Sequence, residues 1–270
     1  RHVAAGAQLG AIDAQGGNIG SVNRGSAVGE MSVEQVQAGN PGVPEGEASP
    51  ISTVTELGIL PLRNTVVYPQ MPHQLTAGRD RSLRVLDAAA EGDNVIGIFT
   101  QRNAEIEDPG SEDLFTMGTL AKIHRVFKMP DGTVRLIVQG LARARMVKIV
   151  HEQPYLKAQI ETIEETGDEE DTTIRALQRA VSAQFQAIVD LSPQLPDELK
   201  VVAVNVDHSG RLADLVAFYI DLPLEEKQNV LELTDIADRL EYVTGLLARE
   251  QEILEVGASI QSQVQEKLGK

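Results

Sequence analysis

Apolar and polar residues alternate along the middle of the chain, first over residues 121–129 and again over 134–139. A repeat of two is typical of a strand that buries one face. The intervening Pro-Asp-Gly-Thr at 130–133 has the chemistry of a tight turn, because glycine adopts a positive φ at little cost. These two stretches are therefore predicted to form a β-hairpin.

Short apolar stretches on both sides of this hairpin predict further strands, at 58–62, 74–77, 95–99, 141–150 and 155–163. One helix is expected over 81–90, capped by Asp80. Its buried face would present Leu83, Leu86 and Ala90. Residues 57–165 are therefore predicted to be a mostly β lobe with one helix, arranged as a small barrel or a folded sheet.

From residue 166 onward, apolar residues recur at steps of three and four, which predicts helices. The expected helices cover 174–189, 197–205, 212–219, 223–231 and 236–268. Pro196 and Pro223 open two of them, since proline is tolerated in a first turn, and Thr234 is expected to cap the last. Residues 166–270 are therefore predicted to be a helical lobe that ends in a long helix.

The last helix carries an apolar stripe to the end of the chain. Its later members are Ile253, Val256, Ile260, Val264 and Leu268. We expect this helix to continue past Lys270 in the native protein and to join a further module. A glycine costs up to about 1 kcal/mol against alanine inside a helix, so a break at Gly257 is the competing interpretation.

Residues 1–56 differ from the rest of the chain. Ten of the 23 glycines fall in the first 50 positions, and no aromatic residue precedes Tyr68. Such a segment buries too little apolar surface to offset its chain entropy, so a disordered extension is predicted. A mitochondrial transit peptide is disfavoured, because six acidic residues face only two arginines. Position 1 is Arg rather than Met, so we expect a fragment or a processed chain.

Composition narrows the function classes further. The 270 residues include no cysteine, which excludes disulfides and thiolate chemistry and fits a reducing, cytoplasmic location. The formal net charge of -16 makes the chain a poor binder of nucleic acids and of anionic membranes. No apolar stretch approaches the roughly 20 residues of a membrane span, so no membrane partner is expected.

Motifs that would support catalysis are absent from the sequence. The phosphate-binding pattern Gly-x-x-x-x-Gly-Lys-Ser/Thr and the hydrolase pattern Gly-x-Ser-x-Gly do not occur, and the five histidines lack zinc-ligand spacing. Asp207, His208 and Ser209 resemble a triad only in composition, because adjacent side chains cannot reach triad geometry. Ser209 is instead expected to cap the following helix. No catalytic, cofactor-binding or metal-binding residue is therefore predicted.

Two charged clusters also have a structural interpretation. Six of the eight residues in 164–171 are acidic. They are read as a solvated loop that places acids at a helix N-terminus, rather than as a metal or partner site. Arg143, Arg145 and Lys148, with Arg135 nearby, lack interleaved aromatics. We interpret them as a salt-bridged sheet surface rather than a nucleic-acid site.

Seven segments together resemble the N-terminal domain of the ATP-dependent Lon protease, in the order and at the spacing of that family over residues 57–270. The segments are Leu60–Pro69, Gly78–Ser82, Leu114–Thr119, Pro130–Thr133, Gln139–Ala144, Arg211–Asp214 and Leu224–Gln228. Each alone is a weak signal, since Pro-Asp-Gly-Thr is simply a turn. Residues 1–56 are not covered by the resemblance.

The resemblance implies an α+β fold, with a PUA-like β lobe followed by a helical lobe. It also implies a role in selecting and holding unfolded, damaged or degron-bearing protein substrates. In that family a separate ATPase module, which uses ATP and Mg, unfolds the substrate, and a Ser-Lys protease module cleaves it. This chain has neither module, so it is expected to be no enzyme alone, without a cofactor, and part of a homo-oligomer in the full protein.

Two other functions stay open from the sequence. One is a stand-alone substrate-binding adaptor of the Lon type without protease activity, and the other is an uncharacterised hydrolase, which the missing motifs disfavour. Within the matched segments, Arg63 and Arg79 are expected to form contacts inside the lobe, with a substrate contact as the alternative. Gly78 and Gly118 are expected to allow backbone conformations that a Cβ atom would penalise.

Overall fold

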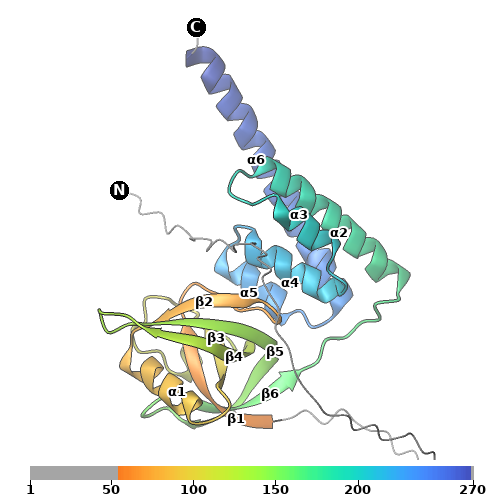
Figure 1. Ribbon diagram of the computed structural model, residues 1–270. Helices are drawn as coiled ribbons and strands as arrows, with labels where there is room; N and C mark the ends of the chain where they lie inside the picture. Colours follow the sequence, from red (N-terminus) through yellow and green to blue (C-terminus); the bar gives the residue numbers. More distant parts are fainter. Residues whose placement is uncertain (1–53, 269–270) are drawn as a thin grey trace, which may run out of the picture. The chain divides into compact units, whose positions relative to one another are not determined.

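The computed structural model describes residues 54–268, with side chains up to residue 264 (Figure 1). The strands are β1 (Val54–Leu62), β2 (Pro72–Ala77), β3 (Val95–Thr100), β4 (Met117–Lys128), β5 (Val134–His151) and β6 (Lys157–Ile163). The helices are α1 (Asp80–Ala90), the short η1 (Ser111–Asp113), α2 (Thr172–Leu191), α3 (Glu198–Val204), α4 (Ser209–Tyr219), α5 (Leu224–Glu232) and α6 (Ile236–Leu268). The α+β fold predicted from the sequence is confirmed.

Of residues 1–56, which were predicted to be a disordered extension, the structure describes only the last three. Residues 1–53 lie outside the described part of the chain. Val54, Thr55 and Glu56 are not an extension, because they form the start of β1 and pair with Glu161, Ile160 and Gln159 of β6. The β lobe therefore begins three residues earlier than predicted. The start of β1 could not be read from the sequence, because no change of pattern separates Val54 and Thr55 from the glycine-rich segment before them.

The long strand β5 organises the sheet. Its first half pairs with β2 and β4, and its second half pairs with β4 and β6. Because β6 also pairs with β1, and β1 with β3, the pairings run in a ring β5–β4–β3–β1–β6–β5, with β2 outside it as an edge strand (Figure 1). The predicted hairpin is confirmed: its turn closes with Met129 N–H donating to the Thr133 carbonyl oxygen, and Gly132 has a φ of 83°.

Apolar side chains cover β3 on both faces, which explains why it reads as one continuous apolar stretch. Ile98 packs into a cluster with Leu60, Leu136 and α1, whereas Phe99 packs into a second cluster with Ile160. Helix α1 closes the first cluster through Val85 and Leu86. Of the α1 residues predicted to be buried, Leu83 is half-buried and Ala90 is exposed, since the helix turns its Ser82–Leu86 side inward.

Two glycines are required by close approach rather than by a special φ. A Cβ atom on Gly118 would lie 2.3 Å from the Ile98 carbonyl oxygen, and one on Gly140 would lie 2.1 Å from that of Tyr68. The expected conformational reason is therefore wrong for Gly118, and for Gly78, because neither has a positive φ. At Gly78 the nearest neighbour of an added Cβ would be Thr133 Cγ2 at 3.1 Å.

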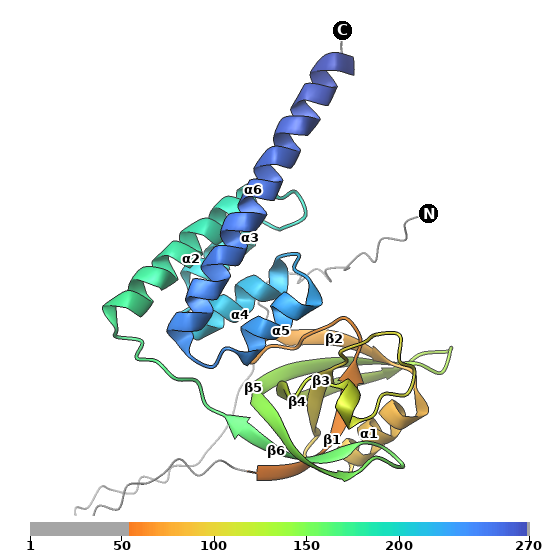
Figure 2. The same cartoon turned by 180° about the vertical axis from the view of Figure 1, so that it is seen from behind.

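The helical lobe packs around α2 and α6, which lie side by side in both views (Figures 1 and 2). Its core extends into the β lobe and includes Tyr68 and Met117. The Tyr68 hydroxyl donates to the Lys227 carbonyl oxygen at 2.7 Å, and Gln228 Nε2 donates to the Met117 carbonyl oxygen at 2.9 Å. The two lobes therefore share one core and belong to a single compact unit.

Helix ends differ in detail from the sequence predictions. Asp80 is the first residue of α1, and Arg79 occupies the N-cap position without a side-chain bond. The start of α6 is capped by Asp235 rather than Thr234, since Asp235 Oδ1 accepts from the Asp238 N–H at 3.1 Å. Helix α6 also runs through Gly257 without interruption, so the competing prediction of a break there is wrong.

Candidate functional site

The Asp207–Ser209 segment holds no catalytic arrangement. The Ser209 hydroxyl donates to Glu169 Oε2 at 2.6 Å, and its N–H donates to Glu169 Oε1 at 2.9 Å, while His208 is largely exposed. Ser209 is therefore not the cap that the sequence predicted, since it is the first residue of α4 and Glu169 supplies the capping oxygen. Glu169 thus holds both the hydroxyl and the N–H of Ser209 at the start of α4, which is a helix-capping contact and contains no Ser–His pair.

The described residues also offer no cluster of metal-binding side chains. No group of three or more His, Asp or Glu side chains in residues 54–264 has the geometry to hold a metal ion. No helix among the described residues is long and apolar enough to cross a membrane.

The acidic segment 164–171 is more than a solvated loop. Asp171 caps α2 as expected, by accepting from the Thr173 N–H at 2.6 Å, and this bond and that of the Thr173 side chain lower the pKa of Asp171. Glu169 caps α4, and Glu165 binds two buried arginines. Glu165 remains 36% exposed, as the solvated interpretation expects, but Glu165 and Glu169 also fasten the loop to both lobes, which that interpretation did not predict.

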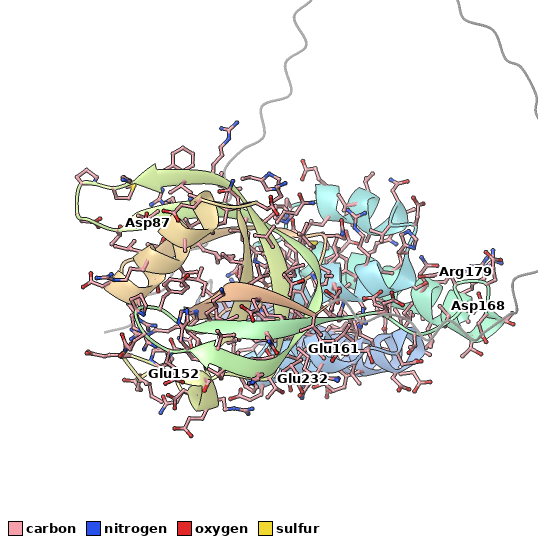
Figure 3. All side chains as sticks on the ribbon, turned by 90° about the horizontal axis from the view of Figure 1, so that it is seen from below. Asp87, Glu152, Glu161, Asp168, Arg179 and Glu232 are labelled. Atoms are coloured by element: carbon pink, nitrogen blue, oxygen red, sulfur yellow. The ribbon has the colours of Figure 1, made fainter. Side chains whose placement is uncertain are left out.

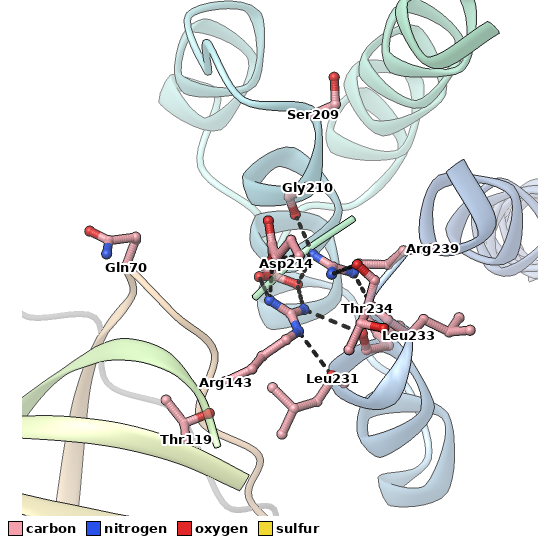
Figure 4. Close-up of polar contacts among 12 residues, drawn as sticks. Gln70, Thr119, Arg143, Ser209, Gly210, Asp214, Leu231, Leu233, Thr234 and Arg239 are labelled. Carbon is pink, nitrogen blue, oxygen red and sulfur yellow. Dashed lines mark hydrogen bonds and ion pairs between the residues drawn. The ribbon is translucent and has the colours of Figure 1, made fainter. Parts of the chain in front are cut away.

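The predicted basic cluster is divided by the structure. Arg143 is 1% exposed and forms a two-pronged contact with Asp214, at 2.6 and 3.0 Å, at the junction of the lobes (Figure 4). Arg143 also donates to Glu165 at 2.5 Å and to the Leu231 carbonyl oxygen at 2.9 Å. Burial opposes the charge of Arg143, but Asp214 and Glu165 outweigh it and raise its pKa.

A second arginine completes this junction. Arg239 is fully buried and donates to Glu165 Oε1 at 2.7 Å and to the Leu233 carbonyl oxygen at 2.7 Å. The expectation of a sheet-surface cluster holds for Arg145, which lies 3.9 Å from Glu161 and is half exposed, but not for Arg143. These contacts join β5, the segment 164–171, α4 and α6 at one buried point.

Three sizeable clefts adjoin α1, and the largest of these three has a volume of about 440 Å³. It lies between the second half of α1 and the strand ends of the β lobe. Most of its lining residues are apolar or glycine: Leu57, Gly58, Val85, Ala88, Ala89, Gly92, Val95, Leu120, Tyr155 and Ile160. At its rim Lys157 lies 3.4 Å from Glu56. The small side chains on α1 leave the room that larger ones would fill.

The second cleft, of about 300 Å³, lies between α1 and the tip of the β4–β5 hairpin. Leu83 and Leu86 form one wall, and Val126 and Val134 form the other. Asp87 on α1 stands at its edge, beside the hairpin (Figure 3). Val126 is 49% exposed, so the strand offers apolar surface that no described residue covers.

The third cleft, of about 370 Å³, separates the end of β1 from the edge strand β2. Arg63 and Arg79 both line it. Each also bonds within the lobe, since Arg79 donates twice to Gln101 Oε1 at 3.0 Å and Arg63 donates to the Ile106 carbonyl oxygen at 3.3 Å. Burial, and then the charge of Arg63, lower the pKa of Arg79. Both expected roles of these arginines are compatible with this geometry.

Further apolar side chains are exposed on the helical lobe. They lie on α3 and on the second half of α6: Val201, Val202, Val204, Ile253, Val256, Ile260 and Val264. Hollows and patches of this kind bind short apolar stretches of another chain, and they supply no reactive group. The sequence located the α6 stripe but none of the clefts, because each cleft is lined by segments that are distant along the chain.

Comparison with known proteins gives a consistent result. Residues 56–249 match the family model of the ATP-dependent protease La (LON) substrate-binding domain. The chain is 43% identical over 214 residues to a Lon protease of Dictyoglomus thermophilum, and 38% identical over 216 residues to that of Escherichia coli. These alignments cover 79% and 80% of this chain, and 27% of each relative.

Solved structures show the same fold. The N-terminal domain of the Mycobacterium avium complex Lon protease superposes with a TM-score of 0.61 at 20% identity, and it covers 72% of this chain and 98% of that one. A Lon N-terminal domain protein from Xanthomonas campestris superposes with a TM-score of 0.51 at 18% identity. The chain thus spans about a quarter of the length of the curated relatives it matches, but nearly all of these domain structures.

Proposed function

Because the chain belongs to the family of Lon protease substrate-binding domains, we propose that it holds unfolded, damaged or degron-bearing proteins in the clefts around α1. The observation that carries this proposal is the cleft of about 440 Å³ lined by apolar residues of α1 and the sheet. Folded proteins bury their apolar side chains, so a surface that accepts such side chains selects chains that have failed to fold.

The role is one of binding, and chemistry is assigned to other modules. In the parent protein an ATPase module, with ATP and Mg, would pull on the held chain, and a serine protease module would cleave it. The domain would raise the local concentration of substrate beside the ATPase module, which is an effective-concentration effect. Since the chain contains no cysteine, we place this function in a reducing compartment, the cytoplasm.

A homo-oligomer is also part of the proposal. Ile253, Val256, Ile260 and Val264 follow one another at three- and four-residue steps on α6, and each is about half exposed. An apolar stripe of this spacing suits packing against another helix. We propose that it is covered in the full protein, either by a second copy or by the following module of the same chain.

Filling the largest cleft tests the proposed function. The probe is fluorescein-labelled β-casein that has been unfolded in urea and diluted into the full 270-residue chain, with binding followed by fluorescence anisotropy. Ala88→Phe adds a ring inside the cleft and should weaken binding at least fivefold. Ala90→Phe adds the same ring to the exposed side of α1, outside the cleft, and should leave binding unchanged.

Two controls show whether a loss of binding comes from the filled cleft. Circular dichroism melts of both variants must match the parent chain, so that lost binding is not lost folding. The same samples should neither hydrolyse ATP nor cleave casein. If Ala88→Phe and Ala90→Phe bind the casein probe as tightly as the parent chain, the cleft is not the binding site.

A further inference from the structure

Charge is unevenly distributed along this acidic chain. Residues 114–151 contain seven Lys and Arg residues and a single acid, Asp131. This segment supplies β4 and β5, and the neighbouring strand β2 has no acid either. A chain with a net charge of -16 therefore presents one three-stranded surface that carries only positive charge.

The strand register places three of these cations, Lys122, Arg125 and Arg135, on one face. Lys122 lies opposite Gln139, Arg125 opposite Ile137, and Phe127 opposite Arg135. Directly opposed residues share a face of a sheet. The other face is the buried one, since Leu136 and Val138 are fully buried. We call the outer surface formed by Lys122, Arg125, Phe127, Arg135 and Ile137 the basic sheet face.

The basic sheet face has no partner in the described part of the chain. Lys122, Arg125 and Arg135 are exposed, and none of them forms an ion pair with a residue of 54–264. Phe127 is 43% exposed on the same face. His124 also lies here and bonds to Gln139 at 3.1 Å. Three unpaired cations around an exposed aromatic ring and Ile137 complement a segment that is both acidic and apolar.

We propose that the basic sheet face binds short, extended, acidic segments of protein substrates, with an apolar residue between the acids. This inference rests on the proposed function and names the class of segment that the domain prefers. Alternate residues of an extended chain are about 7 Å apart, which is the spacing of the three cross-strand pairs. The pattern Asp-x-Leu-x-Asp would place its acids near Lys122 and Arg135 and its leucine over Ile137.

The size of the surface favours a peptide over a nucleic acid. A long polyanion would extend past the three pairs and meet acidic groups at the end of the hairpin, where Asp131 forms the turn and Asp87 stands on α1 (Figure 3). The field of the whole chain also repels a long anion, whereas a short segment meets only the local cations.

Peptide binding to the full chain tests this inference. The probes are fluorescein-labelled peptides with the sequence Ser-Asp-Ser-Leu-Ser-Asp-Ser, and its counterparts with asparagine or lysine in place of aspartate. Two exposed ion pairs should make the aspartate peptide bind about fivefold tighter than the asparagine peptide. The lysine peptide should bind more weakly than both. Raising the salt concentration should reduce the preference for aspartate.

Charge-reversal variants test whether the preference for the aspartate peptide comes from the basic sheet face. The double variant Lys122→Glu/Arg135→Glu should abolish it, because two attractive contacts become repulsive. Lys148→Glu reverses a single charge on an exposed residue at the far end of β5 and should keep the preference. Neither substitution breaks an ion pair of the described residues, so both proteins should melt like the parent chain.

The outcomes separate this inference from the proposed function. If unfolded casein binds but the aspartate and asparagine peptides bind equally, the inference is wrong and the proposed function stands. If neither casein nor any peptide binds, both fail. If a labelled 12-nucleotide single strand of DNA binds tighter than the aspartate peptide, and if the double variant loses this DNA binding, the face is a nucleic-acid site and the inference is overturned.

Discussion

His73 should make the junction of the two lobes sensitive to pH. It lies on β2, is 7% exposed, and its ring meets that of Phe218 on α4 edge to face, with centroids 4.9 Å apart. Its Nε2 accepts from the Tyr68 N–H at 3.3 Å, which requires the neutral ring. Burial, and then the nearby charge of Lys227, lower the pKa of His73 from 6.5 to about 4.

The direction of the effect follows from proton binding. Between pH 6.5 and pH 4 the unfolded chain holds a proton on His73 and the folded chain does not, so stability falls as the pH is lowered through this range. With those two pKa values, linkage gives a loss of about 2 kcal/mol between pH 7 and pH 5, and about 3 kcal/mol at pH 4. Below pH 4 both states are protonated and the loss stops growing.

The substitution His73→Gln should remove this dependence. A glutamine amide oxygen can accept the Tyr68 N–H bond at every pH, so the variant keeps the contact and loses the titration. Urea unfolding, followed by circular dichroism at pH 7, 6 and 5, measures the free energy of unfolding of both proteins. The parent chain should lose about 2 kcal/mol more than the variant between pH 7 and pH 5.

Other titrating groups contribute equally to both proteins and cancel in the difference. His124→Gln, which removes the exposed imidazole on the hairpin, should keep the full pH dependence. Parallel losses in the parent chain and in His73→Gln would refute the reasoning, because they would mean that the folded chain accepts a proton on His73 as readily as the unfolded chain.

Three further substitutions or measurements test the fold. Arg143→Met should lower the free energy of unfolding by about 3–5 kcal/mol, because it removes both hydrogen bonds to the buried Asp214 carboxylate and leaves only Arg239, at 3.6 Å, beside it. Arg145→Met should cost less than about 1 kcal/mol, and equal losses in urea unfolding would contradict the buried junction. Gly118→Ala should lower the free energy of unfolding by about 1–3 kcal/mol, since its Cβ would lie 2.3 Å from the Ile98 carbonyl oxygen. Gly245→Ala, with open space around it in α6, should stabilise the fold by up to about 1 kcal/mol. Thermal melts that show no effect of either substitution would contradict this argument. Amide exchange over 258–268 should show protection that rises with protein concentration, and high protection at every concentration would mean that this half of α6 is not free to pair with a second copy.

Local patterns predicted those parts of the fold that depend on neighbours in sequence. The alternation over 121–139 gave the hairpin and its turn, and steps of three and four gave the helices of the second lobe. Both signals are repeats within a single strand or helix, and they arise because one side of that element faces the core. Helix caps were less predictable, since Glu169 reaches α4 from a different segment and displaces Ser209 from the expected role.

Positions that meet another lobe escaped prediction. Arg143 and Arg145 are two residues apart on β5 and should share a face, yet Arg143 is buried and Arg145 is half exposed. The alternation is correct, but α4 and α5 cover the position of Arg143 and not that of Arg145. A repeat along one strand cannot show where a later segment docks, so the junction and the clefts stayed hidden.

The junction also bears on how a binding domain can serve a distant module. Arg143 and Asp214 link the sheet to α4, and Arg239 links the same cluster to α6. A single buried network thus connects the strand that carries the basic sheet face with the helix that is proposed to leave the domain. A bound segment would then hold a defined position relative to the start of α6, because the intervening contacts are buried and paired. Loosening this network should therefore weaken the delivery of a substrate more than its binding, since the clefts around α1 are built within the β lobe alone.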